Sequence, residues 1–297
     1  MAIPESQLDT WARQGAIAGS RDTYATVKRC LESSTVPYGD KDFEVFLQGS
    51  YGNDTNIYAE SDVDVVIRLD STYYYDIDAL DSDAQAAYHA ATSPGTYSYD
   101  QFKSDVVAVL RDCFGSAVNV GTKAIAIDPS GNRRKADVIV AAAFRRYHNF
   151  SSSMKSDYLS GICFFTSDGT RVDNYPKQHS ENMTYRHQAT DSWLKPLVRI
   201  LKNMRRRMEA DGLIPPGIAP SYFLEGLLYN VPVDKFGGSY ESTMIAALNW
   251  ILAADRDALL CANEAYYLVQ DEPHVCWQRA DCEQFLSSVV DFWNGWE

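Results

Sequence analysis

Positive charge is scarce in this chain of 297 residues, in which 27 Lys and Arg residues stand against 40 Asp and Glu residues. The resulting net charge is −13, and the isoelectric point is near 4.8. Both values have the wrong sign for a protein that coats duplex DNA, so we expect no strong nucleic-acid surface. Any nucleotide chemistry must therefore use a local basic patch.

Long apolar runs and patterned cysteines are also missing. No run approaches the roughly 20 apolar residues that a membrane-spanning helix needs, and the N-terminal residues MAIPESQLDTWARQG are polar where a signal peptide would be apolar. We therefore expect a cytoplasmic protein with no membrane partner. The six cysteines contain no CxxC pair, and their scatter over a long chain predicts buried thiols rather than a disulfide framework.

Hydrophobic residues make up 45% of the chain, which is enough for a substantial core. The length favours one large domain or two ordinary ones, and we expect two lobes. The first half shows both helical and strand patterns and is therefore mixed α/β. It is predicted to contain a long or broken N-terminal helix over 5–33, strands over 43–47 and 63–69, an insertion with a short helix over 71–95, a helix over 99–114, and a hairpin of 123–127 and 135–142.

The second half is predicted to be a helical lobe. Helical patterns cover 193–210, 221–230, 240–260 and 281–292, and Pro and Gly residues separate them. The join between the two lobes is expected within 168–190, a polar stretch rich in Asn, Ser and Thr.

Asp62 and Asp64 stand at the start of an apolar run, where a carboxylate is costly unless something offsets its charge. Because successive strand side chains point to opposite faces, these two carboxylates share a face. A divalent cation between them would remove their repulsion and use their hard oxygen atoms as ligands. Asp137 enters another apolar strand directly after the hairpin, and we expect it to complete a two-metal carboxylate cluster.

Gly49 and Ser50 lie upstream in a small-residue turn that can hold phosphate oxygens, because backbone N–H groups approach closely there and a hydroxyl is present. Metal beside phosphate suits phosphoryl transfer: one ion lowers the pKa of an attacking hydroxyl, and the other stabilises the triphosphate and the leaving pyrophosphate. Asp76 and Asp78 repeat the Asp-x-Asp spacing without the turn or the apolar run, so we assign them to a loop.

These residues resemble the signature of the polymerase-β-like nucleotidyltransferase superfamily, and more narrowly that of the CD-NTases, bacterial relatives of cyclic GMP-AMP synthase and oligoadenylate synthetase. The resemblance is carried by Gly49-Ser50, Thr55-Asn56-Ile57, Ser61-Asp62-Val63-Asp64, Asp137, Val198-Arg199-Ile200-Leu201-Lys202 and Pro220-Ser221-Tyr222-Phe223-Leu224-Glu225. It implies an α+β fold, with a nucleotidyltransferase core of mixed sheet, helices and a long N-terminal helix over 1–180. An α-helical lobe over 181–297 would complete the nucleotide pocket, so that the site lies between the lobes.

Carried over position by position, the resemblance implies that Asp62, Asp64 and Asp137 are catalytic and bind two Mg²⁺ ions, for which Mn²⁺ can substitute. Asp137 would also help to activate the attacking hydroxyl. The residues expected to contact the donor nucleotide are Gln48, Gly49 and Ser50, and those expected to contact its β and γ phosphates are Lys202 and Ser221.

Other polar segments leave alternatives open. Arg199, Lys202, Arg205 and Arg206 share a helix face, which indicates either an anionic ligand or a solvated surface. The cluster 133–135 fits a solvated turn better, and 145–146 could lie near the site or away from it. The segment 174–182 either shapes base pockets or links the lobes. In the turn at 52–54 this chain has Gly-Asn-Asp, whereas many relatives have a basic residue there.

The resemblance implies template-independent synthesis of a cyclic di- or trinucleotide second messenger from ribonucleoside triphosphates, with release of pyrophosphate, in anti-phage signalling of the CBASS type. One alternative is a nucleotidyltransferase that modifies a non-nucleotide acceptor, and another is a catalytically silent nucleotide-binding scaffold. The helical-lobe motifs count against the first alternative, and the three aspartates count against the second. We expect a monomer, and the sequence leaves room for a regulatory protein partner.

Overall fold

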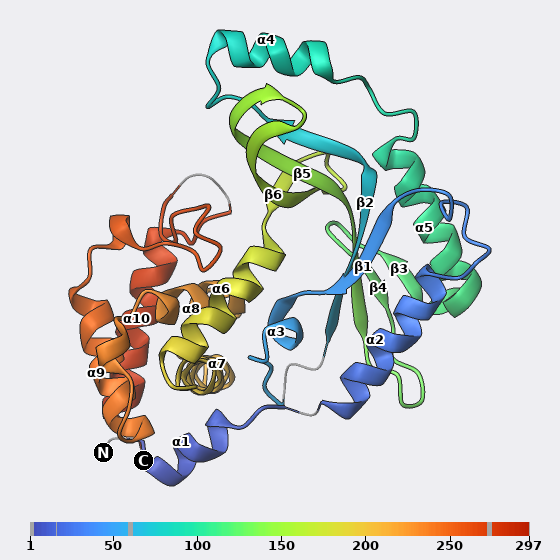
Figure 1. Ribbon diagram of the computed structural model, residues 1–297. Helices are drawn as coiled ribbons and strands as arrows, with labels where there is room; N and C mark the ends of the chain where they lie inside the picture. The colour runs from blue at the N-terminus through green and yellow to red at the C-terminus, as the bar shows by residue number, and fades with distance from the viewer. Residues whose placement is uncertain (1–2, 16, 59–61, 272–274, 297) are drawn as a thin grey trace. The chain divides into compact units, whose positions relative to one another are not determined.

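Two long strands, β2 (Val63–Asp76) and β5 (Ala136–Ser152), run parallel at the centre of a mixed sheet. In the computed structural model, which describes residues 3–15, 17–58, 62–271 and 275–296, the strand order is β1-β2-β5-β4-β3, with β6 paired to β5 and β7 to β6 (Figure 1). All pairs other than β2 with β5 are antiparallel. The other strands are β1 (Phe43–Leu47), β3 (Val118–Val120), β4 (Ile125–Ile127), β6 (Lys155–Phe165) and β7 (Arg171–Asn174). The predicted α+β class is confirmed.

The chain forms two units, which we describe separately. The strand unit consists of residues 18–48 and 62–176 and contains the whole sheet. The helical unit consists of Met1–Ile17, Gly49–Ser61 and Lys177–Glu297. This division differs from the predicted domains 1–180 and 181–297, because the first residues and the segment that carries the Gly-Ser turn group with the C-terminal helices.

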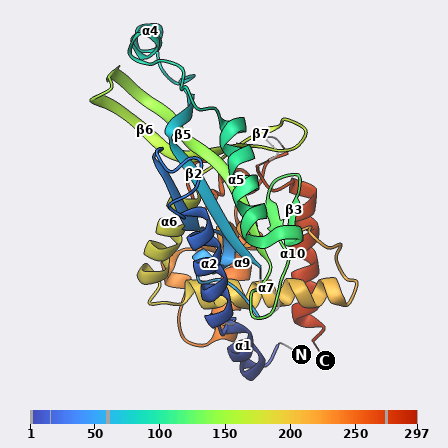
Figure 2. The same ribbon diagram turned by 90° about the vertical axis from the view of Figure 1, so that its right-hand side faces the viewer.

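Helices α2 (Ala18–Leu31) and α5 (Tyr99–Phe114) pack on one face of the sheet in the strand unit (Figure 1, Figure 2). Helix α5 has the predicted bounds because Ser98 caps its start and Gly115, with φ 59°, ends it. Cys30 and Cys113 form a disulfide between the two helices, whereas the four other cysteines are buried thiols. The prediction of thiols was therefore wrong for this pair, because helix packing brings its Cα atoms within 6.3 Å of each other.

The predicted insertion is an extension of the sheet. Strand β2 continues to Asp76, and α4 (Ser82–Ala91) follows it as the expected short helix. Tyr88 on α4 packs with Tyr147 and Phe150 of β5 in a small separate core. Asp76 is therefore a strand residue rather than a loop residue, and it pairs with Arg146 at 3.2 Å.

Of the two alternatives for the N-terminal helix, long or broken, the broken helix is confirmed: it consists of α1 (Glu5–Ala12) and α2. Gly15 lies between them and donates its N–H to the Asn56 carbonyl at 3.0 Å. A Cβ atom at this glycine would lie 2.6 Å from the Ile57 carbonyl carbon, so only glycine permits this approach.

The helical unit packs its helices around one apolar core. Its elements are α1, the single turn α3 (Gly49–Gly52), α6 (Pro176–Ala189), α7 (Leu194–Ala210), α8 (Ser221–Tyr229), α9 (Tyr240–Ala253) and α10 (Arg279–Asn294). Short 3₁₀ turns occupy Val233–Lys235 and Arg256–Ala258 of this unit, and another occupies Gly115–Ala117 of the strand unit. None of the helices in the described ranges is both long and apolar enough to cross a membrane.

Candidate functional site

Asp64 and Asp137 are direct neighbours in the parallel register of β2 and β5. Asp62 precedes β2, and the entry of the chain into the strand is fixed by the Val63 N–H, which donates to the Lys135 carbonyl at 3.1 Å. The strand unit therefore sets Asp64 beside Asp137, which is distant from it in sequence, with Asp62 at the entry to β2. Ser61 of the motif lies outside the described residues.

Lys135 connects two of these carboxylates. Its Nζ lies 2.8 Å from Asp62 Oδ2 and 3.0 Å from Asp137 Oδ2. The hydrogen bond to Asp62 is the main cause that raises the pKa of Lys135, and Asp137 adds to it against the opposing effect of burial. Lys135 lies just before β5 with its side chain 38% exposed, in keeping with the predicted solvated position, but that side chain also pairs with Asp62 and Asp137.

The chemistry of this donor set fits Mg²⁺, which prefers carboxylate oxygens. The ammonium group of Lys135 already donates hydrogen bonds to two of the three aspartates. A positive charge at this position reduces the repulsion between the carboxylates, as a metal ion would. No three His, Cys, Asp or Glu side chains in the described part of the chain are grouped closely enough to form a metal site on their own. Metal binding by Asp62, Asp64 and Asp137 therefore stays a prediction.

The Gly-Ser turn follows directly on β1. The Gln48 N–H donates to the Asp64 carbonyl at 3.0 Å, which holds the end of β1 beside β2. Gly49 has φ 66°, a value that favours glycine, and starts the single turn α3. Within the helical unit, the Asn53 N–H donates to the Gly49 carbonyl at 3.1 Å and the Thr55 N–H donates to the Ser50 carbonyl at 2.9 Å. The nucleotide contacts of Gln48, Gly49 and Ser50 stay predictions.

A buried carboxylate lies behind this turn in the helical unit. Glu225 Oε2 accepts hydrogen bonds from Asn53 Nδ2 at 2.9 Å and from His179 Nε2 at 2.6 Å. Glu225 Oε1 accepts the hydroxyl of Thr55. Lys202 Nζ donates to the Thr55 carbonyl at 3.0 Å. We call these five residues the Glu225 network.

Glu225 is held ionised despite its burial. Burial by itself raises the pKa of this carboxyl, but the hydrogen bond and charge of His179, the charge of Lys202 and the Thr55 hydroxyl outweigh it and lower the pKa to about 2. Sequence reasoning gave neither Glu225 nor His179 a role of this kind. The available signal was a single carboxylate within the otherwise uncharged helix SYFLEGLLY.

The basic face of α7 is largely buried, so the alternative of a solvated surface is wrong for Lys202 and Arg205. Arg205 Nη1 donates to the Ala219 carbonyl at 2.8 Å and to Ser221 Oγ at 3.3 Å. Arg206 on the same helix is exposed. The triphosphate contacts of Lys202 and Ser221 stay predictions.

The structure gives the positions of two segments for which the sequence left alternatives open, 145–146 and 174–182. Arg145 stacks over the Tyr73 ring with its Cζ 3.9 Å from the centroid, and Arg145 pairs in register with Tyr75 of β2. Arg145 and Arg146 are therefore well past Asp137 along β5, at about 3.3 Å per residue, and away from the aspartates. The segment 174–182 is the end of β7 followed by the first turns of α6, and the boundary between the two units falls within it, after Pro176, as the alternative of a linker predicts. A role of this segment in shaping base pockets stays a prediction.

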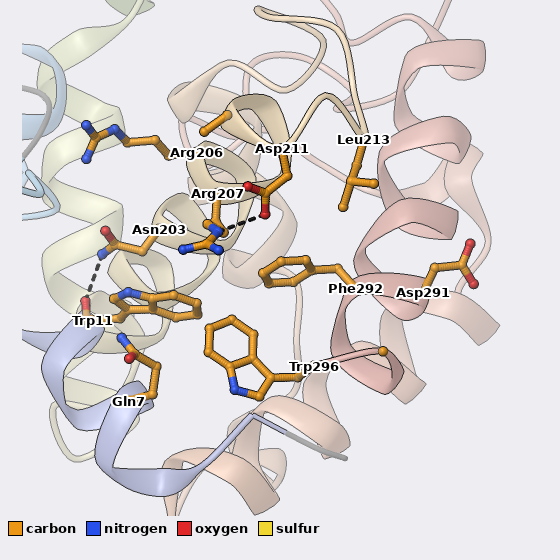
Figure 3. A pocket seen from close by; sticks show the side chains of 12 residues that line it. Gln7, Trp11, Asn203, Arg206, Arg207, Asp211, Leu213, Asp291, Phe292 and Trp296 are labelled. Atoms are coloured by element: carbon orange, nitrogen blue, oxygen red, sulfur yellow. Dashed lines mark hydrogen bonds and ion pairs between the residues drawn. The ribbon is translucent and has the colours of Figure 1, made fainter.

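A separate cavity of about 740 Å³ lies among α1, α7 and α10 of the helical unit (Figure 3). Trp11, Phe292 and Trp296 form aromatic walls, with Trp296 packed edge-on against both other rings. Its charged lining is balanced, because Arg206 and Arg207 are matched by Asp211 and Asp291. None of the predicted site residues lines it.

Residues 181–294 match the family model of the cGAS/DncV-like nucleotidyltransferase C-terminal helical domain. The chain is 37% identical over 298 residues to the cyclic UMP-AMP synthase of Rhodothermus marinus, covering 100% of this chain and 99% of that protein. It is 33% identical over 304 residues to the cyclic nucleotide synthase CdnE01 of Staphylococcus haemolyticus, covering 100% of each.

Solved structures show the same similarity. The R. marinus CdnE c-UMP-AMP synthase with Apcpp and Upnpp superposes with a TM-score of 0.89 at 36% identity, over 99% of this chain and 97% of that chain. The Elizabethkingia meningoseptica CdnE cyclic dinucleotide synthase with GTP and Apcpp superposes with a TM-score of 0.78 at 28% identity, over 99% of this chain and 100% of that chain.

Proposed function

The chain belongs to the family of cGAS/DncV-like nucleotidyltransferases, the CD-NTases, and we propose that it joins two ribonucleoside triphosphates into a cyclic dinucleotide and releases pyrophosphate. The observation that carries the proposal is the register of Asp64 beside Asp137, with Lys135 bonded to both Asp62 and Asp137, in a chain that is 37% identical to a cyclic UMP-AMP synthase over its whole length. Nucleotidyltransferases of this family generally need divalent metal ions.

In the proposed reaction a ribose hydroxyl of one nucleotide attacks the α-phosphorus of the other. An O–P bond forms, and the bond between the α-phosphorus and the pyrophosphate oxygen breaks. A second attack of the same kind closes the ring. Two Mg²⁺ ions, when bound, would lower the pKa of the hydroxyl and neutralise the charge on the phosphates.

The residues of this chain would divide that work. The carboxylates of Asp62, Asp64 and Asp137 would hold the ions, and Asp137 would help to take the proton from the attacking hydroxyl. Gln48, Gly49 and Ser50 would orient the donor nucleotide. Lys202 and Ser221 would bind its β and γ phosphates and so hold the leaving group in line.

The proposal is tested by incubating the purified protein with all four ribonucleoside triphosphates and Mg²⁺ or Mn²⁺. We expect a phosphatase-resistant cyclic dinucleotide in the mass spectrum, and one made of uridine and adenosine is the first to look for, given the R. marinus relative. The product should disappear in Asp64→Asn and Asp137→Asn. It should persist in Asp83→Asn, which alters an exposed carboxylate on α4.

Other outcomes of this assay would favour a different function. Consumption of a triphosphate only when a non-nucleotide acceptor is added would support transfer to that acceptor. Tight nucleotide binding without turnover of any triphosphate would support a silent scaffold. The anti-phage role and a regulatory protein partner belong to the proposal and need a test in infected cells.

A further inference from the structure

We propose that Glu225 is a positioning residue that holds the Gly-Ser turn in the shape that receives the donor nucleotide. This inference rests on the proposed function, because it takes the turn at 49–55 as part of the nucleotide site. The first observation is burial: Glu225, Asn53, Thr55, His179 and Lys202 are each at most 5% exposed. Burying an ionised carboxylate is unfavourable unless hydrogen bonds and an opposite charge compensate for it, and here both are present.

The second observation is that the contacts of Glu225 continue to the turn itself. Asn53 and Thr55 bind Glu225 through their side chains, and through their backbone N–H groups they bind the carbonyls of Gly49 and Ser50. Each residue therefore links the buried carboxylate to one of the two turn residues. The turn α3 and helix α8, which carries Glu225, are in contact.

Asp54, which lies between Asn53 and Thr55, is also fixed by hydrogen bonds. Asp54 has φ 57°, and its conformation is fixed by Lys195 Nζ, 3.1 Å from its Oδ2, and by Arg199 Nη1, 2.6 Å from its carbonyl oxygen. Its neighbour Asn53 directs its side-chain amide inward to Glu225. The residues Asn53 and Asp54 thus hold the turn through hydrogen bonds to α7 and α8.

His179 supplies the third hydrogen bond to the carboxylate. Its ring stacks on Tyr222 with centroids 4.9 Å apart, which fixes the ring plane, and its Nε2 lies 2.6 Å from Glu225 Oε2. No partner of His179 Nδ1 lies within the described residues. His179 Nε2 is the donor in this contact, because an ionised carboxylate oxygen can only accept a hydrogen bond. His179 therefore supports Glu225 rather than taking part in chemistry.

The variant Glu225→Gln tests the proposal. Its amide nitrogen replaces an oxygen that accepts hydrogen bonds, so at least one of the donors from Asn53, Thr55 or His179 loses its acceptor in either orientation of the amide. We expect hydrogen exchange of the peptide 49–57 in the unliganded protein to become about tenfold faster. Peptides from α9 and α10 should exchange as before, and Asp234→Asn, which alters an exposed carboxylate elsewhere in the helical unit, should change nothing.

Kinetics supply the second readout. We expect KM for the donor triphosphate to rise about tenfold in Glu225→Gln with a smaller change in kcat, because the chemical groups stay in place while the binding turn loosens. His179→Gln, which can keep an N–H donor toward Glu225, should retain most of the wild-type KM. His179→Leu, which cannot, should resemble Glu225→Gln.

A variant in the turn itself distinguishes local loosening of the turn from general unfolding of the protein. Asn53→Ala removes one hydrogen bond of the network without touching the helices, and it should speed exchange of 49–57 as well. Combining it with Glu225→Gln should add less than the sum of the two effects, since both variants act on the same hydrogen-bond network. Strict additivity would overturn the proposal.

The outcomes separate this proposal from the proposed function. Loosening of 49–57 in a protein that makes no product would support the positioning role and refute the synthase. Normal product synthesis with unchanged exchange and unchanged KM in Glu225→Gln would refute the positioning role alone. Faster exchange spread evenly over the helical unit would show that Glu225 serves the fold as a whole, which also refutes it.

Discussion

Asp64 and Asp137 lie directly opposite each other on the parallel strands β2 and β5, and Lys135 joins Asp137 to Asp62 through one ammonium group. Carboxylates this close repel each other, so the free energy of the strand unit depends on a nearby cation. In the structure that cation is a side chain. In the proposed reaction it would be metal, and the two must then compete for the same oxygen atoms.

Replacing Lys135 by Met should therefore tighten divalent metal binding. Removing the competing charge should be worth at least about 1 kcal/mol, or about fivefold in the dissociation constant, even with the screening of water. Titration of Mn²⁺ followed by electron paramagnetic resonance measures this affinity. Lys123→Met, which alters an exposed lysine of the same unit, is the matched control. Equal or weaker binding in Lys135→Met would show that the ammonium does not oppose the ion.

Lys202→Met should affect both stability and substrate binding. Lys202 is fully buried and its charge helps to hold Glu225 ionised, so removing it should lower the free energy of unfolding by about 3 to 5 kcal/mol. If Lys202 also reaches the triphosphate, KM should rise beyond the value in Glu225→Gln. Urea unfolding and steady-state kinetics provide the two measurements. Arg206→Met on the exposed side of α7 should leave both unchanged.

The disulfide between Cys30 and Cys113 should stabilise the strand unit, because it joins α2 to α5 across a long loop. Reduction should lower the free energy of unfolding by about 2 to 4 kcal/mol. Thermal unfolding with and without reductant measures the effect, and Cys113→Ser should be insensitive to reductant. Cys163→Ser, which alters a free buried thiol, should keep the sensitivity. A melting temperature that ignores reductant in the wild type would mean that the two cysteines are not paired in solution.

Glu225 should make stability depend on acid pH. Its pKa is lowered from an ordinary value of 4.5 to about 2, so its contribution is fully present above about pH 4.5 and is lost as the pH falls toward 2. The difference in unfolding free energy between the wild type and Glu225→Gln should shrink over that interval. Urea titrations of both proteins at several pH values measure the difference. If the difference in unfolding free energy between the two proteins stayed constant with pH, Glu225 would not be ionised in the folded protein.

Much of the fold was predictable because it depends on local patterns. Strand β1 and helix α5 have the predicted bounds, since alternation and capping residues are local signals. Helix α6 was not predicted, because its composition is polar and only His179 and Met183 in it are buried. Strands β2 and β5 extend further than their apolar runs suggest, since pairing with neighbours and a small tyrosine-rich core support the extra length.

By itself, the sequence determined the spacing of Asp62 and Asp64, the turn before them and the Asp137 strand, because period-two patterning and Gly chemistry are properties of neighbouring residues. Only the tertiary structure decided the parallel register that sets Asp64 opposite Asp137, the pairing of Cys30 with Cys113, and the burial of Glu225 behind the turn. These relationships join segments far apart in the chain. Their free energy comes from packing and desolvation, which no local pattern records.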